Sequence, residues 1–256
     1  MSRKGKKTAK PKAKPDAMSA FTRRTFIGAG VFAAAAVIGC ETLNTGPIME
    51  VLPDGDEDGL PVLPQNNLKP PVANPVAASN GIIPRSSWAH GGPIMSRITP
   101  LNGVQYITFH HSGDSNPFTA TDTASVAVHL ESIRQFHTNP VTSDPKTTGR
   151  AWGDIAYHFG IDPAGRIWEL RSLQYQGSHV KGRNPHNVGV CVLGNFSKQP
   201  MNAAQQATIK SFGAQLRKKF AVPLANVYAH REIGQTDCPG TAMYPFIVSI
   251  RSKGLI

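Results

Sequence analysis

The chain has 256 residues, of which 40% are hydrophobic and 17% charged, and this composition excludes wholesale disorder. Its three cysteines, at positions 40, 191 and 238, are too few and too far apart for a disulfide-dense scaffold. The formal net charge of +11 is spread unevenly, because residues 1–24 hold nine basic residues and one acidic residue. Residues 83–256, with 17 basic and nine acidic residues, are only moderately basic.

The first 40 residues have the pattern of an export signal. A lysine-rich start leads to Arg23-Arg24 and then to an apolar stretch at 25–39, which is shorter than the ~20 residues that a spanning helix needs. Val37-Ile38-Gly39-Cys40 resembles a bacterial lipobox, in which the cysteine is lipidated. A solvated basic tail and a permanent membrane helix are the alternatives. We expect a twin-arginine lipoprotein signal peptide over 1–40 and an exported protein, lipid-anchored through Cys40 to a bacterial membrane and facing the periplasm or cell wall.

A linker and one folded domain follow. Residues 41–82 hold seven prolines and no aromatic residue, which predicts a flexible linker. Beyond it, alternating β-branched and aromatic residues predict strands, and apolar residues at helical spacing predict two helices. The predicted strands are 104–109, 155–161, 166–170, 188–193 and 226–229, and the predicted helices are 122–137 and one capped by Asn202. We expect a single α/β (α+β) domain over 83–256, with a central mixed sheet flanked by helices.

Three segments of this domain carry residues that bind metals. The His110-His111 pair and His230 each end a predicted strand, and Cys238 follows His230 by eight residues. Two histidines and one thiolate would give zinc three protein ligands and leave a fourth position for water, which is typical of a catalytic site. A strand-end histidine is also often an ordinary buried polar residue, and Cys-Pro-Gly is often a turn. The spacing alone leaves both interpretations open.

Six motifs in order resemble one family, the zinc N-acetylmuramoyl-L-alanine amidases shared by phage lysozyme-amidases and peptidoglycan recognition proteins. The resemblance covers nearly all of residues 83–256. The motifs are Arg85-x-x-Trp88, Tyr106 to Ser112, Trp152 to Phe159 with Asp162 to Arg171, Gly177 to Asn184, Val188 to Phe196, and His230 to Gly240. The chain departs from many recognition proteins after Arg171, where Ser172-Leu173 replace a Gly-Trp pair.

The resemblance implies a role for each matching residue. His110, His230 and Cys238 would bind one zinc ion, and His111 would point to the other face of its strand. Tyr157 matches the catalytic tyrosine, and Thr236 stands where other members have lysine or threonine and would assist the oxyanion. Further residues are expected to contact the substrate: Arg171, His179, Arg183 and Asn184. Cys191, in mid-strand, is interpreted as a small buried hydrophobic residue.

The function implied is zinc-dependent hydrolysis of the amide between the lactyl group of muramic acid and L-alanine in peptidoglycan. The partners would be peptidoglycan or muropeptides and, through the anchor, a membrane; we expect a monomer and no nucleic-acid partner. One alternative is a recognition module that binds peptidoglycan without cutting it, although non-catalytic relatives lack the cysteine ligand. Another is a nucleic-acid-binding protein driven by the basic tail, which requires residues 1–24 to persist in the mature protein.

Overall fold

A computed structural model describes residues 81–146 and 148–256 of the chain. In this part of the chain five strands form one mixed sheet in the order β3-β2-β4-β1-β5. The strands are β1 (Tyr106–His111), β2 (Phe159–Ile161), β3 (Ile167–Glu169), β4 (Asn187–Val192) and β5 (Val227–Ala229). The strands β2, β4, β1 and β5 run parallel to one another, and β3 pairs antiparallel with β2 at one edge.

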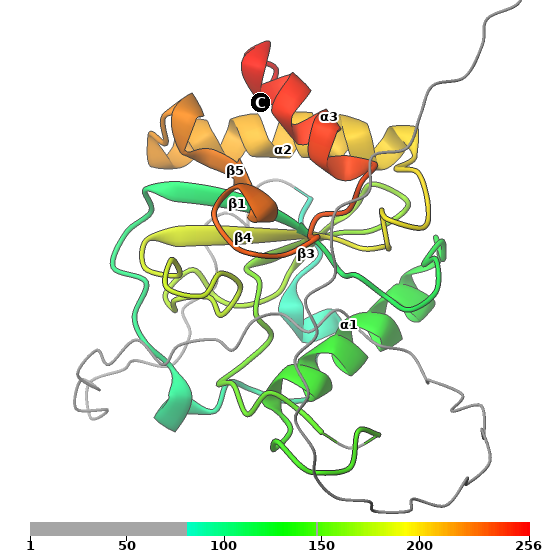
Figure 1. Cartoon of the computed structure of the whole chain (residues 1–256). Helices are drawn as coiled ribbons and strands as arrows, with labels where there is room; N and C mark the ends of the chain where they lie inside the picture. The colour runs from blue at the N-terminus through cyan, green and yellow to red at the C-terminus, as the bar shows by residue number, and fades with distance from the viewer. Residues whose placement is uncertain (1–80, 147) are drawn as a thin grey trace, which may run out of the picture. The chain divides into compact units, whose positions relative to one another are not determined.

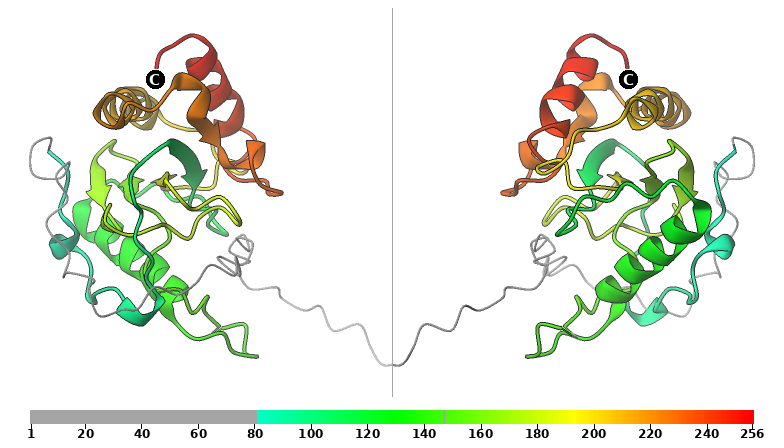
Figure 2. Two further views of the ribbon diagram at one scale, coloured as in Figure 1. Left: turned by 90° about the vertical axis from the view of Figure 1, so that its left-hand side faces the viewer. Right: turned by 90° about the vertical axis from the view of Figure 1, so that its right-hand side faces the viewer.

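Helices cover both faces of the sheet. Figures 1 and 2 show α1 (Thr123–Thr138) on one face, and α2 (Ala203–Phe220) and α3 (Met243–Ser252) together on the other. Every residue of β4 is buried, as expected for a central parallel strand covered on both sides. Val190 packs in the cluster that includes Phe212 of α2, whereas its neighbour Cys191 packs in the cluster that includes Leu130 of α1. The sheet therefore separates two apolar layers.

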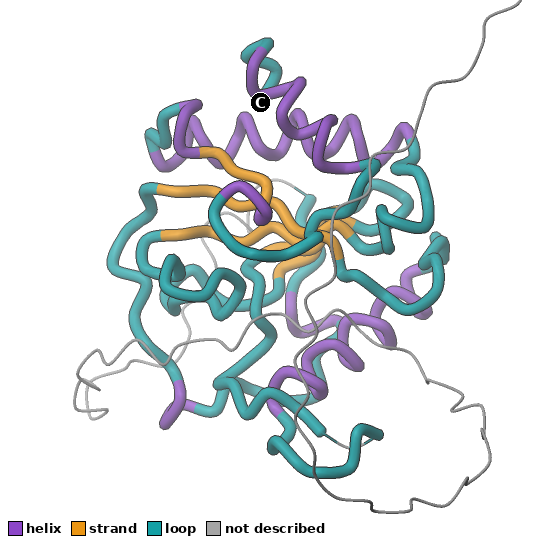
Figure 3. The backbone as a smooth tube through the Cα atoms, in the orientation of Figure 1, coloured by secondary structure: helices purple, strands orange, loops and turns teal. Residues whose placement is uncertain are grey.

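The predicted fold class is confirmed, and the element boundaries shift by a few residues. The first strand begins at Tyr106 and extends to His111, so both histidines of the pair lie within it. The strand predicted at 155–161 is shorter and covers only Phe159–Ile161, and loops carry much of the remaining chain (Figure 3). The Asn202 cap is confirmed, since its side chain accepts from the N–H of Gln205.

The helix α3 was not predicted from the sequence. Its buried residues Met243, Ile247 and Ile250 have helical spacing, and Pro245 lies in the first turn, where a missing N–H costs no helical hydrogen bond. Within residues 81–146 and 148–256, no helix has both the length and the apolar character to cross a membrane. The predicted signal peptide, Cys40 and nearly all of the linker lie outside the described residues.

Candidate metal centre and active site

His110 lies near the carboxyl end of β1, an interior strand between β4 and β5. Its strand neighbours Ile107 and Phe109 face α2 and α3, so alternation directs His110 to the α1 face. The side chain is fully buried, and its ring centroid lies 5.0 Å from that of Tyr157. His111 points the opposite way, as predicted, and its Nδ1 accepts a hydrogen bond from the N–H of Phe196. One histidine of the pair thus belongs to the site, and the other is structural.

His230 follows directly after β5, the strand beside β1, and begins a short 3₁₀ turn, His230–Glu232. The Glu232 carboxylate accepts from the backbone N–H of Ala229 at 2.7 Å and forms two hydrogen bonds with Arg251 of α3. These contacts fix the turn against α3 and hold the buried His230 ring 4.5 Å from the His110 ring, centroid to centroid. Because carboxyl ends of parallel strands share one sheet edge, β1 and β5 bring the two histidines together.

Cys238 completes the group from the loop after His230. Its carbonyl accepts from the N–H of Arg231, and its own N–H donates to the Thr236 hydroxyl at 3.1 Å. The Cys238 sulfur is fully buried, 3.4 Å from the backbone nitrogen of His111 and 3.7 Å from Nδ1 of His110. A backbone N–H directed at sulfur favours the thiolate, which is the form that binds metals.

The donor atoms of His110, His230 and Cys238 all lie within 4.8 Å of one another. At a tetrahedral angle, zinc bond lengths of about 2.3 Å to sulfur and about 2.0 Å to nitrogen place the two donors about 3.5 Å apart. The 3.7 Å between Cys238 Sγ and His110 Nδ1 agrees with that spacing. A buried N,N,S donor set with three protein ligands fits a transition metal with an open coordination position.

The surroundings of His110 and His179 keep both imidazole rings neutral. Burial lowers the pKa of His110 well below its ordinary value, and His230, His179 and His111 add to the shift. Burial also lowers the pKa of His179. Both rings are therefore neutral, and a neutral imidazole is the form that can bind a metal ion. By contrast, burial raises the pKa of the Cys191 thiol, which agrees with its interpretation as a small buried hydrophobic residue.

Tyr157 and Thr236 both lie beside the metal-ligand group. The Tyr157 ring packs against His110 and is 2% exposed, in the loop that leads into β2. Thr236 is partly exposed and precedes Cys238 by two residues, where its hydroxyl oxygen accepts from the Cys238 N–H. The structure thus gives Thr236 a role in shaping the Cys238 turn. The geometry places both hydroxyl-bearing residues at the site that the sequence indicates.

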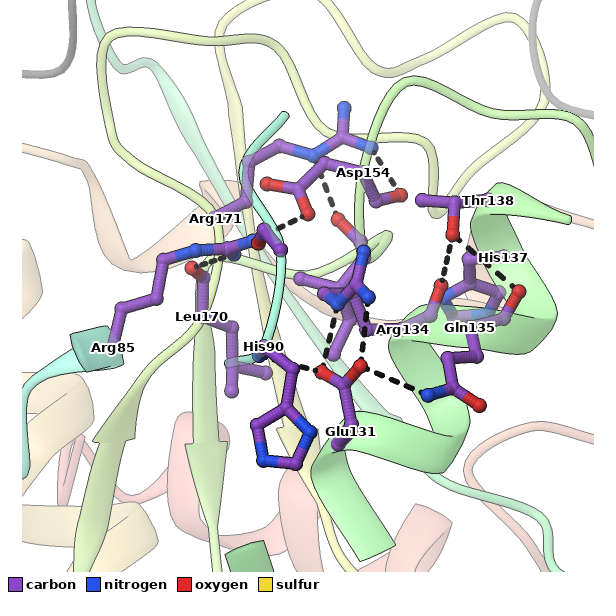
Figure 4. A network of polar contacts seen from close by, with 12 residues as sticks. Arg85, His90, Glu131, Arg134, Gln135, His137, Thr138, Asp154, Leu170 and Arg171 are labelled. Carbon is purple, nitrogen blue, oxygen red and sulfur yellow. Dashed lines mark hydrogen bonds and ion pairs between the residues drawn. The ribbon is translucent and has the colours of Figure 1, made fainter. Parts of the chain in front are cut away.

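Arg171, which the sequence predicts to contact the substrate, forms contacts inside the protein. It is 2% exposed, and its guanidinium donates to the carbonyls of Asp154 at 2.9 Å, Ile155 at 2.7 Å and Gln176. Figure 4 shows Arg171 beside Asp154, whose carboxylate also accepts from Arg85. This network joins the loop before Tyr157 to the segment after β3. These contacts account for the buried charge of Arg171 and do not support the substrate contact expected from the sequence.

The segment from Gly177 to Asn184 also differs from its expected role. Asn184 is fully buried, and its side-chain oxygen accepts from the N–H groups of His179 and Val180, so it shapes the turn. His179 is 2% exposed and contacts His110 rather than solvent. Of the four expected substrate contacts, Arg183 is exposed. Sequence reasoning missed the contact between His179 and His110, because residues 69 positions apart leave no local pattern.

A family model described as N-acetylmuramoyl-L-alanine amidase matches residues 100–241, which is more than half of the chain and includes all three metal-binding candidates. The chain belongs to this amidase family. The family assignment agrees with the ordered motifs of the sequence and with the mixed sheet between helices.

The relatives of this amidase-family chain carry two kinds of names. Peptidoglycan-recognition protein SC2 of Drosophila melanogaster is 26% identical over 164 residues, covering 64% of this chain and 82% of the relative. The N-acetylmuramoyl-L-alanine amidase of Homo sapiens is 27% identical over 172 residues, covering 65% of this chain but only 27% of that longer protein. The names of these relatives refer to peptidoglycan in two ways, some to its recognition and others to its cleavage.

Solved structures show the same fold. Drosophila PGRP-LB aligns with a TM-score of 0.56 at 25% identity, covering 66% of this chain and 92% of that one. Peptidoglycan recognition protein-LE, solved in complex with tracheal cytotoxin, a monomeric diaminopimelic acid-type peptidoglycan, aligns with a TM-score of 0.56 at 26% identity, covering 66% and 93%. The amidase LysC of Clostridium intestinale shares the fold at 21% identity, with a TM-score of 0.50 over 70% and 99% of the two chains.

Proposed function

We propose that the chain is a zinc-dependent N-acetylmuramoyl-L-alanine amidase, which hydrolyses the amide between the muramoyl lactyl group and L-alanine of peptidoglycan stem peptides. The observation that carries this proposal is the complete His110–His230–Cys238 group, with the donor atoms within 4.8 Å and Tyr157 packed against it. A module that only recognises peptidoglycan needs no such buried N,N,S set. The recognition function remains the second candidate, because several relatives bear that name.

The three ligand residues would hold one zinc ion, and each is fixed by backbone or helix contacts. When bound, zinc supplies Lewis acidity that activates water and polarises a carbonyl. The protein's own contribution is positioning. Glu232 and Arg251 fix the His230 turn, and the His111 N–H supports the Cys238 thiolate. Tyr157, whose ring packs against His110, would donate a hydrogen bond to the oxyanion that forms as the amide is attacked; losing one such donor typically costs about 3–4 kcal/mol.

The substrate proposed is peptidoglycan or a muropeptide. A relative was solved with a peptidoglycan fragment, and the moderately basic domain suits an anionic wall polymer. Arg183 is the exposed residue of the expected contact set, and its guanidinium would pair with a stem-peptide carboxylate. We further propose export and lipid anchoring through Cys40, which intact mass and lipid labelling of the mature protein would test. A mature protein that retains residues 1–24 would contradict the anchor.

The test of the amidase proposal compares two single cysteine variants of the purified protein. Cys238→Ser removes a ligand, whereas Cys191→Ser makes the same chemical change at a buried thiol on the strand beside His110. We expect peptidoglycan to release stem peptides with a new N-terminal L-alanine. Release should stop with a chelator and in Cys238→Ser, and persist in Cys191→Ser. Wild-type protein that holds one zinc and binds peptidoglycan without release would establish the recognition function instead.

A further inference from the structure

The ring of His179 lies in a slot made by two glycines. A Cβ added at Gly177 would lie 2.4 Å from the His179 Cδ2, and a Cβ added at Gly189 would lie 2.7 Å from the same atom. Both distances are far below ordinary van der Waals contact, so any side chain at either position would displace the ring. Neither glycine has a positive φ. The space for the imidazole, rather than a special backbone conformation, therefore explains both residues.

Hydrogen bonds hold both nitrogens of the same ring. Nε2 of His179 lies 3.1 Å from the backbone carbonyl oxygen of Asn187, and Nδ1 lies 3.0 Å from Nε2 of His110. On the opposite side of the His110 ring, Nδ1 lies 3.7 Å from the Cys238 sulfur. A continuous line of polar contacts thus runs from a main-chain carbonyl through two imidazoles to the metal-ligand group.

The direction of every hydrogen bond in this line follows from the carbonyl at its end. A carbonyl oxygen only accepts, so Nε2 of His179 carries the proton and donates. The His179 ring is buried among His110, His158 and Tyr157, where a charge would be costly, so the ring is neutral and its Nδ1 is an acceptor. Nε2 of His110 must then donate to it. The Nδ1 of His110 is left with its lone pair, directed to the side where Cys238 lies.

We propose that His179 is the positioning residue of the metal centre, which fixes the tautomer and orientation of His110 so that Nδ1 binds the metal. The proposal rests on the metal site argued above and adds a residue that would act on the metal through its contact with His110. With 2% exposure and both nitrogens engaged inside the protein, His179 is placed to orient His110 rather than to exchange protons with a substrate. Partners of this kind typically change metal affinity by about 10- to 100-fold when removed.

The first experiment uses nitrogen NMR to determine which ring nitrogen carries the proton in His110 and His179 of the metal-free wild-type protein. We expect the proton on Nε2 in both His110 and His179. A proton on Nδ1 of His110 would overturn the proposal, whether or not any variant folds and whether or not the amidase proposal holds.

The second experiment measures zinc affinity, together with the visible spectrum of the cobalt-substituted protein. His179→Leu fills the slot but offers no acceptor, and we expect zinc binding to weaken about 10- to 100-fold. His179→Asn places an amide oxygen near the position of Nδ1 and should recover much of the loss. The matched control is His137→Leu. His137 is another buried histidine, and its Nδ1 accepts a hydrogen bond from the Ala156 N–H. Removing it should leave zinc affinity unchanged.

The outcomes separate this proposal from the one on which it rests. Wild-type protein that binds neither zinc nor cobalt would overturn the metal site and, with it, the role of His179 in positioning a metal ligand. If His179→Leu bound zinc as tightly as the wild type and its cobalt spectrum were unchanged, the positioning role would be overturned and the amidase proposal would stand. Equal weakening in His179→Leu and His137→Leu would show a general loss of packing and would also overturn it.

Discussion

Replacing Gly189 by alanine should damage the metal centre from a strand position that bears no ligand. The new Cβ would lie 2.7, 2.8 and 2.9 Å from three atoms of the His179 ring. The ring would have to retreat by ~0.7 Å to restore ordinary contact, and overpacking of this kind costs about 1–3 kcal/mol of stability. A shift of that size is enough to lengthen the 3.0 Å contact with His110 beyond hydrogen-bonding distance.

The assay has two readouts and one matched control. Denaturant unfolding measures stability, and competition with a chromogenic chelator measures zinc affinity; Gly189→Ala should lower both, the second by about tenfold or more. Gly160→Ala makes the same change on the neighbouring strand β2, where the added Cβ meets only Leu170 and Leu130 at 3.5 Å or more. That control should change stability by less than about 1 kcal/mol and leave zinc affinity unaltered.

If the stability and zinc affinity of Gly189→Ala equalled those of the wild type, the reasoning would be refuted, because the His179 ring would have moved without cost. A loss of stability with unchanged zinc affinity would keep the packing argument but break its link to His110. Equal effects in the two glycine variants would refute the argument from local space.

Three further predictions concern stability. Asn202→Ala removes the side-chain acceptor of the α2 capping box and should cost about 1 kcal/mol in denaturant unfolding, whereas Asn202→Asp should cost much less. Burial lowers the pKa of His137 from 6.5 to about 3, so the neutral ring contributes fully to the free energy of unfolding above pH 6.5. As the pH falls from 6.5 toward 3, that contribution is lost at about 1.4 kcal/mol per pH unit. The free energy of unfolding of His137→Asn should fall less steeply over that range, and an identical fall would contradict the assignment. Glu232→Gln weakens the paired contact with Arg251 and the bond to the Ala229 N–H, and should cost about 1–2 kcal/mol and weaken zinc binding through His230; unaltered zinc binding would show that the turn keeps its shape without the carboxylate.

Local pattern was sufficient for several parts of this protein. Helical spacing from Val126 to Ile133 identifies α1, because the apolar residues at that spacing lie on the buried face of the helix. The β-branched and aromatic residues around Phe109 identify β1, although both faces of that strand are buried. The candidate metal ligands were recognisable for a different reason, the resemblance of six ordered motifs to one family. His110, His230 and Cys238 carry uncommon chemistry at ordered positions, and that order needs no knowledge of the contacts between them.

The tertiary structure decided which polar residues act inside the fold. Arg171 and His179 look like substrate contacts in the sequence, since both are polar residues in motif segments. Only the packing shows that Arg171 donates to three main-chain carbonyls and that His179 bonds to His110, which lies 69 residues away along the chain. A hydrogen bond of that separation leaves no periodic trace, because its geometry is set by strand register and by the space that two glycines leave. The sequence alone thus identified the residues that could bind a metal ion, and the fold determined how those residues are held in place.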